Sequence, residues 1–133
     1  KSYCISEEDY FIIPDDDDKY DTYFQQYLFG QFYAVIGMRY HSNIFSAKMG
    51  TPFVSVSYEQ KMQGFMEKMN LSQYCLPLND LTPIELQERF ALLENNYSEY
   101  KECLISKHSE MKKESYRTTE IMKEVVSRLR IGN

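Results

Sequence analysis

The chain has 133 residues, a length typical of one domain that leaves little room for two independent hydrophobic cores. It is 43% hydrophobic and 26% charged, as in ordinary globular proteins, and no apolar run approaches the roughly 20 residues of a membrane-spanning helix. Fifteen basic and twenty acidic residues give a net charge of −5, which argues against a broad cationic surface for nucleic acid.

Neither the cysteines nor the aspartates indicate a metal site. Cys4, Cys75 and Cys103 are odd in number, lie far apart and show no CxxC spacing, so no disulfide framework is indicated either. The four consecutive aspartates at 15–18 repel one another and converge on one ion only in a shaped loop. We expect a reducing, cytoplasmic setting, no bound metal and a solvated loop at 15–18.

The N-terminal part predicts a strand, a helix and a second strand. A short apolar run at 10–13 predicts a strand closed by Pro14. Apolar residues at helical spacing predict a helix at 20–29 with one apolar face, formed by Tyr20, Tyr23, Phe24, Tyr27 and Leu28. The continuously apolar segment 32–36 is too short for an ordinary helix and predicts a strand buried on both faces.

The alternation continues beyond this segment. A short helical period at 44–49 stops at Gly50, and the β-rich run 53–57 follows. A helix at 59–69 carries a stripe of methionine and phenylalanine that we expect in the core, and a short strand at 74–76 comes next. This alternation predicts an α/β fold, with a parallel sheet and helices on both faces.

Two helices complete the prediction. Thr82-Pro83-Ile84-Glu85 is a capping box with proline at the first helical position, so a helix begins there. A largely polar helix at 97–129 would be about 50 Å long and would extend beyond one domain. Its apolar positions could support self-association into a homo-oligomer: Leu104, Met111, Met122, Val125 and Leu129. We expect a single domain over 1–133, with a core at about 1–95 and a C-terminal helical tail at about 96–130.

Basic and polar residues follow two consecutive predicted strands. Arg39, His41 and Ser42 come after the first strand, and Tyr58 and Lys61 come after the second. Ligands of open parallel sheets bind beyond the carboxyl ends of the strands, where helix N-termini add positive potential. The sequence therefore predicts an anion site at this edge.

The spacing of Arg39 and His41 bears on where the next helix begins. Residues two apart diverge by about 200° on a helix but share a side in an extended segment, so we predict that the helix starts after His41. A guanidinium grips carboxylate or phosphate, a lysine neutralises phosphate, and an imidazole moves a proton near neutral pH. Together they suit a phosphorylated, carboxylated substrate.

Each of these residues also has a plainer interpretation. Arg39 and Lys61 are surface charges and His41 caps a helix in that alternative. Ser42 either contacts phosphate or caps the helix, and Tyr58 either lines the site or is buried at a strand end. His108, in a polar helical stretch, is expected to be exposed.

The segment 36–61, followed by Gly64-Phe65-Met66, resembles the C-terminal signature of the polysaccharide pyruvyl transferases. The shared order is Arg-x-His, an apolar helix, Gly-x-Pro, a strand and Tyr-x-x-Lys, found here at Arg39, His41, Gly50, Pro52, Tyr58 and Lys61. The resemblance covers about residues 30 to 76. It implies a Rossmann-like domain similar to the C-terminal half of B-type glycosyltransferases, and therefore a fragment of a longer two-domain enzyme that is inactive alone.

The resemblance also implies an activity. Members of this family transfer pyruvate from phosphoenolpyruvate to a sugar hydroxyl as a ketal and release phosphate, with no cofactor besides this donor. The implied setting is bacterial exopolysaccharide or cell-wall glycan biosynthesis on a glycan or lipid-linked sugar, in the cytoplasm or at the inner face of the membrane. Acceptor contacts would come from the N-terminal domain.

The resemblance assigns roles to individual residues as well. Arg39 would bind the anionic groups of the donor and Lys61 its phosphate, with Ser42 and Tyr58 as further substrate contacts. His41 would act as general acid toward the enol carbon or the departing phosphate. Two alternatives stay open: a non-catalytic anion-binding module on the same fold, and a glycosyltransferase domain with a nucleotide-sugar donor.

Overall fold

The computed structural model describes residues 10, 12–13 and 21–131, with side chains as far as residue 128. The aspartates at 15–18 and Cys4 lie outside this range. The strand predicted at 10–13 falls partly outside it, and its three described residues belong to no strand.

A three-stranded parallel sheet forms the centre of the fold. The strands are β1 (Val35–Gly37), β2 (Phe53–Ser57) and β3 (Cys75–Pro77), in the order β1-β2-β3. In the register Ile36 pairs with Val54 and Ser55 pairs with Cys75. The predicted α/β, Rossmann-like parallel sheet flanked by helices is confirmed.

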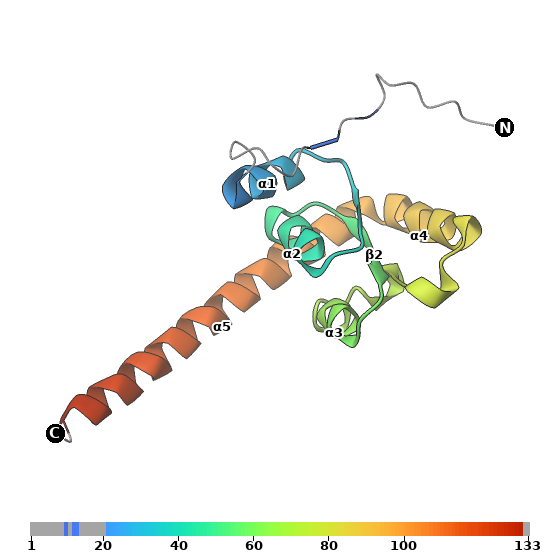
Figure 1. Cartoon of the computed structure of the whole chain (residues 1–133). Helices are drawn as coiled ribbons and strands as arrows, with labels where there is room; N and C mark the ends of the chain where they lie inside the picture. Colours follow the sequence, from blue (N-terminus) through green and yellow to red (C-terminus); the bar gives the residue numbers. More distant parts are fainter. Residues whose placement is uncertain (1–9, 11, 14–20, 132–133) are drawn as a thin grey trace.

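Helices cover both faces of this sheet. α2 (Tyr40–Met49) connects β1 to β2 and α3 (Gln60–Lys68) connects β2 to β3. Both lie on one face, and α4 (Pro83–Asn95) lies on the other (Figure 1). Two single-turn 3₁₀ helices, η3 (Ser72–Tyr74) and η4 (Leu78–Asp80), flank β3. The carboxyl ends of β1 and β2 therefore lead directly into the N-termini of α2 and α3.

Capping side chains set two of the helix starts. The predicted helix at 20–29 is α1 (Thr22–Phe29), which begins where the Asp21 carboxylate accepts a 2.8 Å hydrogen bond from the Phe24 amide. α1 lies beside α2, with the rings of Phe29 and Phe45 edge to face at 5.8 Å. At α4 the Thr82 hydroxyl accepts from the amide of Glu85, which confirms the predicted capping box.

β1 departs from its prediction. The strand is Val35–Gly37 instead of 32–36, and the side chain of Ile36 is 50% exposed instead of buried. The reason is its place in the sheet: β1 is an edge strand, and α4 packs on β2 and β3. A continuous apolar run therefore did not mean burial on both faces here.

The core is centred on β2, whose five residues are all buried. The predicted stripe on α3 faces this core, with Met62, Phe65, Met66 and Met69 all buried. Tyr100 reaches the same core from the C-terminal helix, and its hydroxyl donates a 2.7 Å hydrogen bond to the Phe53 carbonyl. Burial raises the pKa of the Tyr100 phenol, so this donor stays protonated.

Replacing Tyr100 with phenylalanine is expected to lower the free energy of unfolding by about 1 to 2 kcal/mol, because a buried hydrogen bond loses its donor. Tyr97→Phe is the matched control. It removes the more exposed 2.8 Å bond from the Tyr97 hydroxyl to the Tyr33 carbonyl, for which we expect a loss under about 0.5 kcal/mol. Urea unfolding followed by circular dichroism measures both losses, and equal values would contradict this account.

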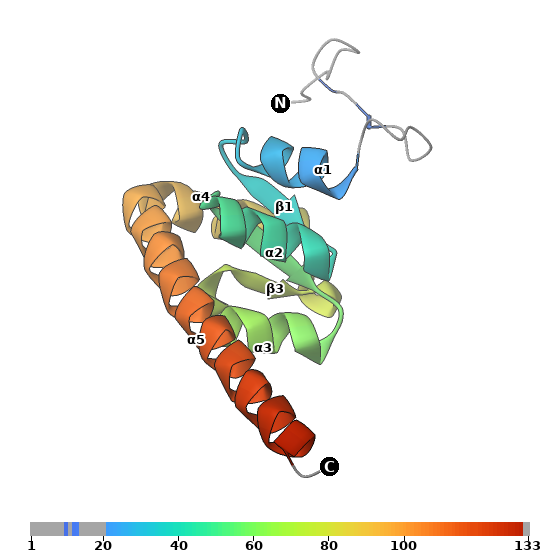
Figure 2. The same cartoon turned by 90° about the vertical axis from the view of Figure 1, so that its left-hand side faces the viewer.

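The C-terminal helix α5 (Tyr97–Ile131) has 35 residues and extends well past the rest of the fold (Figures 1 and 2). Leu104 was expected to support self-association, but it is fully buried because the first turns of α5 pack into the core. Met122 and Val125 are exposed at 58% and 46%, so for them self-association stays a prediction. None of the helices described combines the length and apolar character needed to cross a membrane.

Candidate anion-binding site

α2 begins at Tyr40, so the predicted start after His41 is wrong. Arg39 is the extended N-cap residue, with φ −108° and ψ 145°, and His41 is the second residue of the helix. The helix starts this early because its inner face docks on the sheet from the first turn. There Asn43 is fully buried, and its Nδ2 donates a 2.7 Å hydrogen bond to Ser55 Oγ in β2.

Gly37, the last residue of β1, permits this close approach. A Cβ atom at Gly37 would lie 2.1 Å from Asn43 Oδ1 and 2.9 Å from Ser42 Oγ. Asn43 was not singled out from the sequence. The sequence gives only a weak indication that Asn43 contacts the sheet. It is a polar residue about one turn before the small residues Ser46 and Ala47, on the helix face that approaches the strand.

Lys61 is brought to the start of α2. It is the second residue of α3, and its Nζ lies 4.1 Å from the centre of the Tyr40 ring, a cation–π contact. Tyr40 in turn packs edge to face on Phe65, with ring centres 5.8 Å apart. The two helix N-termini that follow β1 and β2 are thus neighbours.

His41 lies on a different side of α2 from the contact with Lys61. Its ring centre is 6.2 Å from that of Tyr40 and 6.2 Å from that of Phe45, the residue that contacts α1. Both Arg39 and His41 are exposed. A ligand touching His41 and Lys61 together must therefore extend across the first turn of α2.

The remaining two predicted residues occupy the same edge of the sheet. Ser42 Oγ donates a 2.6 Å hydrogen bond to the Arg39 carbonyl and so closes the first turn of α2. Tyr58 is 53% exposed, which excludes the buried alternative, and it helps to line a hollow of about 220 Å³. This hollow lies at the carboxyl ends of β2 and β3 and includes Ser57 and Pro77 in its wall.

The N-termini of α2 and α3 are open to an anion. Neither Arg39 nor Glu59, their N-cap residues, makes a side-chain capping bond, whereas Asp21 and Thr82 cap α1 and α4. First-turn amides without a side-chain acceptor favour phosphate or carboxylate. The Glu59 carboxylate, also exposed, partly offsets the cations at this edge.

Comparison with known families identifies the segment that carries this edge. Residues 9–60 match the family model of the polysaccharide pyruvyl transferases. The resemblance, expected over about residues 30 to 76, is thereby confirmed as far as residue 60, and the match begins earlier, at residue 9; the family name is that of a transferase. No curated protein and no solved structure matches the chain.

The pyruvyl transferase match covers part of the predicted site. It contains Arg39, His41, Ser42 and Tyr58, and it ends one residue before Lys61. It also spans β1, α2 and β2, and stops where α3 begins. The matched segment therefore includes the strand ends and the first of the two open helix N-termini.

Proposed function

We propose that this chain supplies the phosphoenolpyruvate-binding part of a pyruvyl transferase that forms a ketal on a sugar. One observation carries the proposal: the family match spans Arg39 to Ser42, the segment that opens the uncapped N-terminus of α2 beyond the end of β1. A lone Arg-x-His would be weak support. Here, however, the Arg-x-His motif lies at the edge of the sheet where open parallel sheets bind their ligands.

The donor has two anionic groups, and the edge offers separate positions for them. The Arg39 guanidinium suits the planar carboxylate, which it can hold with two parallel hydrogen bonds. The first-turn amides of α3 and the Lys61 ammonium suit the phosphate. Since the helix N-termini are neighbours through Tyr40 and Lys61, one small donor can engage both.

His41 is proposed to supply a proton. Protonation of the methylene carbon turns it into a methyl group and leaves an oxocarbenium-like centre at the neighbouring carbon, which a sugar hydroxyl attacks. That hydroxyl gives up its proton as the new C–O bond forms, which replaces the proton donated by His41. A second hydroxyl then displaces phosphate: the C–O bond to the phosphate breaks, the proton of the second hydroxyl leaves with the phosphate, and the ketal is complete. Arg39 and Lys61 stabilise the leaving phosphate as its charge develops.

The wider context belongs to the same proposal. The acceptor is a glycan or lipid-linked sugar of an exopolysaccharide or cell wall, and the reaction takes place in the cytoplasm or at the inner face of the membrane. A second domain contributes the acceptor contacts, so this chain alone binds the donor without turning it over. The donor is the only small molecule required.

Calorimetric titration with phosphoenolpyruvate tests the proposal. Arg39→Gln should weaken donor binding about tenfold or more, because a charge-assisted pair of hydrogen bonds is lost. Arg117→Gln, a change at an exposed arginine on α5 remote from this edge, is the matched control and should leave the Kd unchanged. Equal affinities of the Arg39 variant and the unchanged protein would contradict the role of Arg39.

One observation favours the second candidate function, an anion-binding module without catalysis. Among the described residues none forms a hydrogen bond with the His41 imidazole, whose neighbours are the rings of Tyr40 and Phe45, so no second group orients it as a proton donor. The same titration separates the alternatives when inorganic phosphate and UDP-glucose are added in parallel. Phosphate binding as tight as donor binding would favour the module, and tighter binding of the nucleotide sugar would favour a glycosyltransferase.

A further inference from the structure

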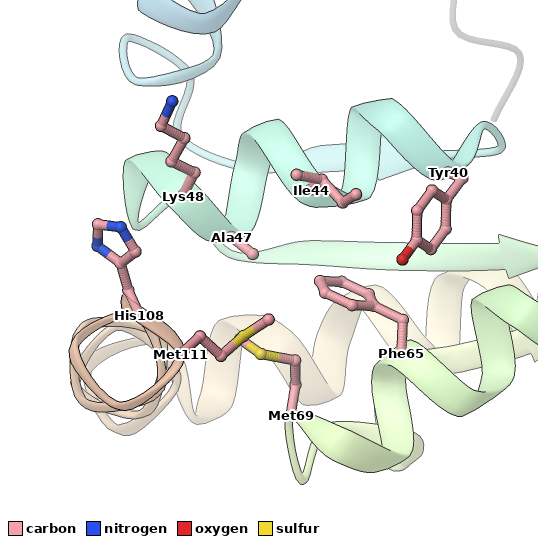
Figure 3. A pocket seen from close by; sticks show the side chains of 8 residues that line it. All are labelled: Tyr40, Ile44, Ala47, Lys48, Phe65, Met69, His108 and Met111. Carbon is pink, nitrogen blue, oxygen red and sulfur yellow. The ribbon is translucent and has the colours of Figure 1, made fainter. Parts of the chain in front are cut away.

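A second hollow lies among α2, α3 and α5, on the same face of the sheet (Figure 3). Its volume is about 230 Å³, which is smaller than the roughly 300 to 1,000 Å³ of pockets that hold drug-sized ligands. Mostly apolar side chains form its walls: Tyr40, Ile44 and Ala47 from α2, Phe65 from α3 with Met69 at its C-cap, and Met111 from α5. Methionine side chains adapt readily to a ligand surface.

Basic groups lie together at one end of this hollow. Figure 3 shows the His108 imidazole extending from α5 toward the end of α2 that carries Lys48. The Lys48 ammonium donates a hydrogen bond to Gln26 Oε1, a neutral acceptor that does not cancel its charge. The Lys48 ammonium is turned toward α1 and the His108 imidazole lies beside the Lys48 stem, so both groups stand at the rim of the hollow and its walls are almost wholly apolar.

The two acidic residues that flank Met111 most closely on α5 are already paired. The Glu110 carboxylate is 2.8 Å from the Lys107 ammonium, and the Glu114 carboxylate is 3.2 Å from the Lys68 ammonium. The residues that line the hollow include no carboxylate. An anionic group at Lys48 and His108 would therefore meet no lining group of like charge.

We propose that this hollow binds a soluble anionic amphiphile, a short hydrocarbon chain that ends in a carboxylate. The chain lies against Phe65, Met69 and Met111, and the carboxylate lies between Lys48 and His108. Roughly eight carbons fill the volume if each takes about 30 Å³, the share of a water molecule in the liquid. The charge at one end and the apolar walls elsewhere match this occupant. The hollow shares the Tyr40 side chain with the donor edge, where Lys61 contacts that ring, but this proposal does not rest on the proposed transferase activity.

Octanoate is the probe, and methyl-labelled methionines report its place by NMR. Saturable binding below about 1 mM should shift the methyl signals of Met69 and Met111, which line the hollow. Met62, buried in the core outside the lining, and Met122, exposed on α5, should stay unshifted and serve as internal controls. Octanol, with the same chain and no charge, should bind at least about fivefold more weakly.

Two kinds of variant locate each half of the ligand. His108→Gln combined with Lys48→Gln should weaken octanoate about tenfold and leave octanol unchanged, whereas Lys113→Gln, an exposed change on α5, should alter neither. Met111→Trp should fill the hollow and abolish binding of both probes.

Three results would overturn the proposal. Equal affinities for octanoate and octanol would show that the hollow does not recognise the carboxylate. Methyl shifts that appear with anionic lipid vesicles but not with octanoate would show that the hollow binds a membrane surface instead of a soluble ligand. If the methyl signal of Met111 shifts with increasing protein concentration in the absence of octanoate, the hollow binds a second copy of the chain.

Discussion

Replacing Gly37 with alanine is expected to destabilise the fold by about 1 to 3 kcal/mol and to lower the melting temperature by roughly 10 °C. The added Cβ would meet Asn43 Oδ1 at 2.1 Å and Ser42 Oγ at 2.9 Å. Asn43 is fully buried and bonded to Ser55, so it cannot move aside without breaking the contact between α2 and β2. The start of α2 must shift instead, and thermal unfolding measures the cost.

Gly64→Ala is the matched control for this prediction. Gly64 lies inside α3, and an added Cβ there would meet nothing within 4 Å. Alanine has the higher helix propensity, so this change should raise the free energy of unfolding by about 0.5 to 1 kcal/mol. If both variants changed stability in the same direction, the close approach at Gly37 would not be the cause.

Replacing His41 with alanine is expected to lower acceptor-dependent release of phosphate from phosphoenolpyruvate by about 100-fold or more. General acid catalysis by a positioned side chain typically contributes about 10² to 10⁴ in rate, and His41 is the proposed proton donor. The assay uses the chain together with the acceptor-binding domain proposed above. The loss should fall on kcat, because Arg39 and Lys61 still hold the donor.

The fold of the His41 variant should be unaffected, because this side chain is exposed on the first turn of α2. Its melting temperature and its affinity for phosphoenolpyruvate are the internal controls. Undiminished turnover would remove His41 from the chemistry. A fall in affinity with kcat unchanged would instead make it a binding residue.

The elements predicted best are those whose local pattern and burial agree. β2 spans Phe53–Ser57 as expected, since a β-rich run bounded by Pro52 occupies the central strand and is buried throughout. The stripe on α3 and the stop of α2 at Gly50 were also correct. Gly50 takes the left-handed conformation, with φ 71°, that a helix end with glycine favours.

The predictions were wrong where contacts between elements far apart in the sequence determine the structure. Periodicity could not show that β1 lies at the edge of the sheet and exposes Ile36, because strand order depends on residues far along the chain. The start of α2 was misplaced for a related reason. It depends on Asn43 reaching Ser55, a contact between two elements that no spacing within α2 displays.

The sequence predicted the location of the candidate site more accurately than the arrangement of its side chains. The strand ends brought Lys61 near the start of α2, but the cation–π contact with Tyr40 was not foreseen. Since the helix includes Tyr40 and His41, the expected pairing of Arg39 and His41 on one side of an extended segment did not form. The hollow that contains His108 needs three helices, and its lining residues lie too far apart in the sequence to form a recognisable motif.

Mapping the bound donor tests the central claim most directly. Amide signals of the chain are followed by NMR during titration with phosphoenolpyruvate. The account predicts saturable shifts, with one common Kd, in the two stretches 37–42 and 57–61 that open α2 and α3. The absence of saturable shifts there, or shifts confined to other parts of the chain, would contradict it.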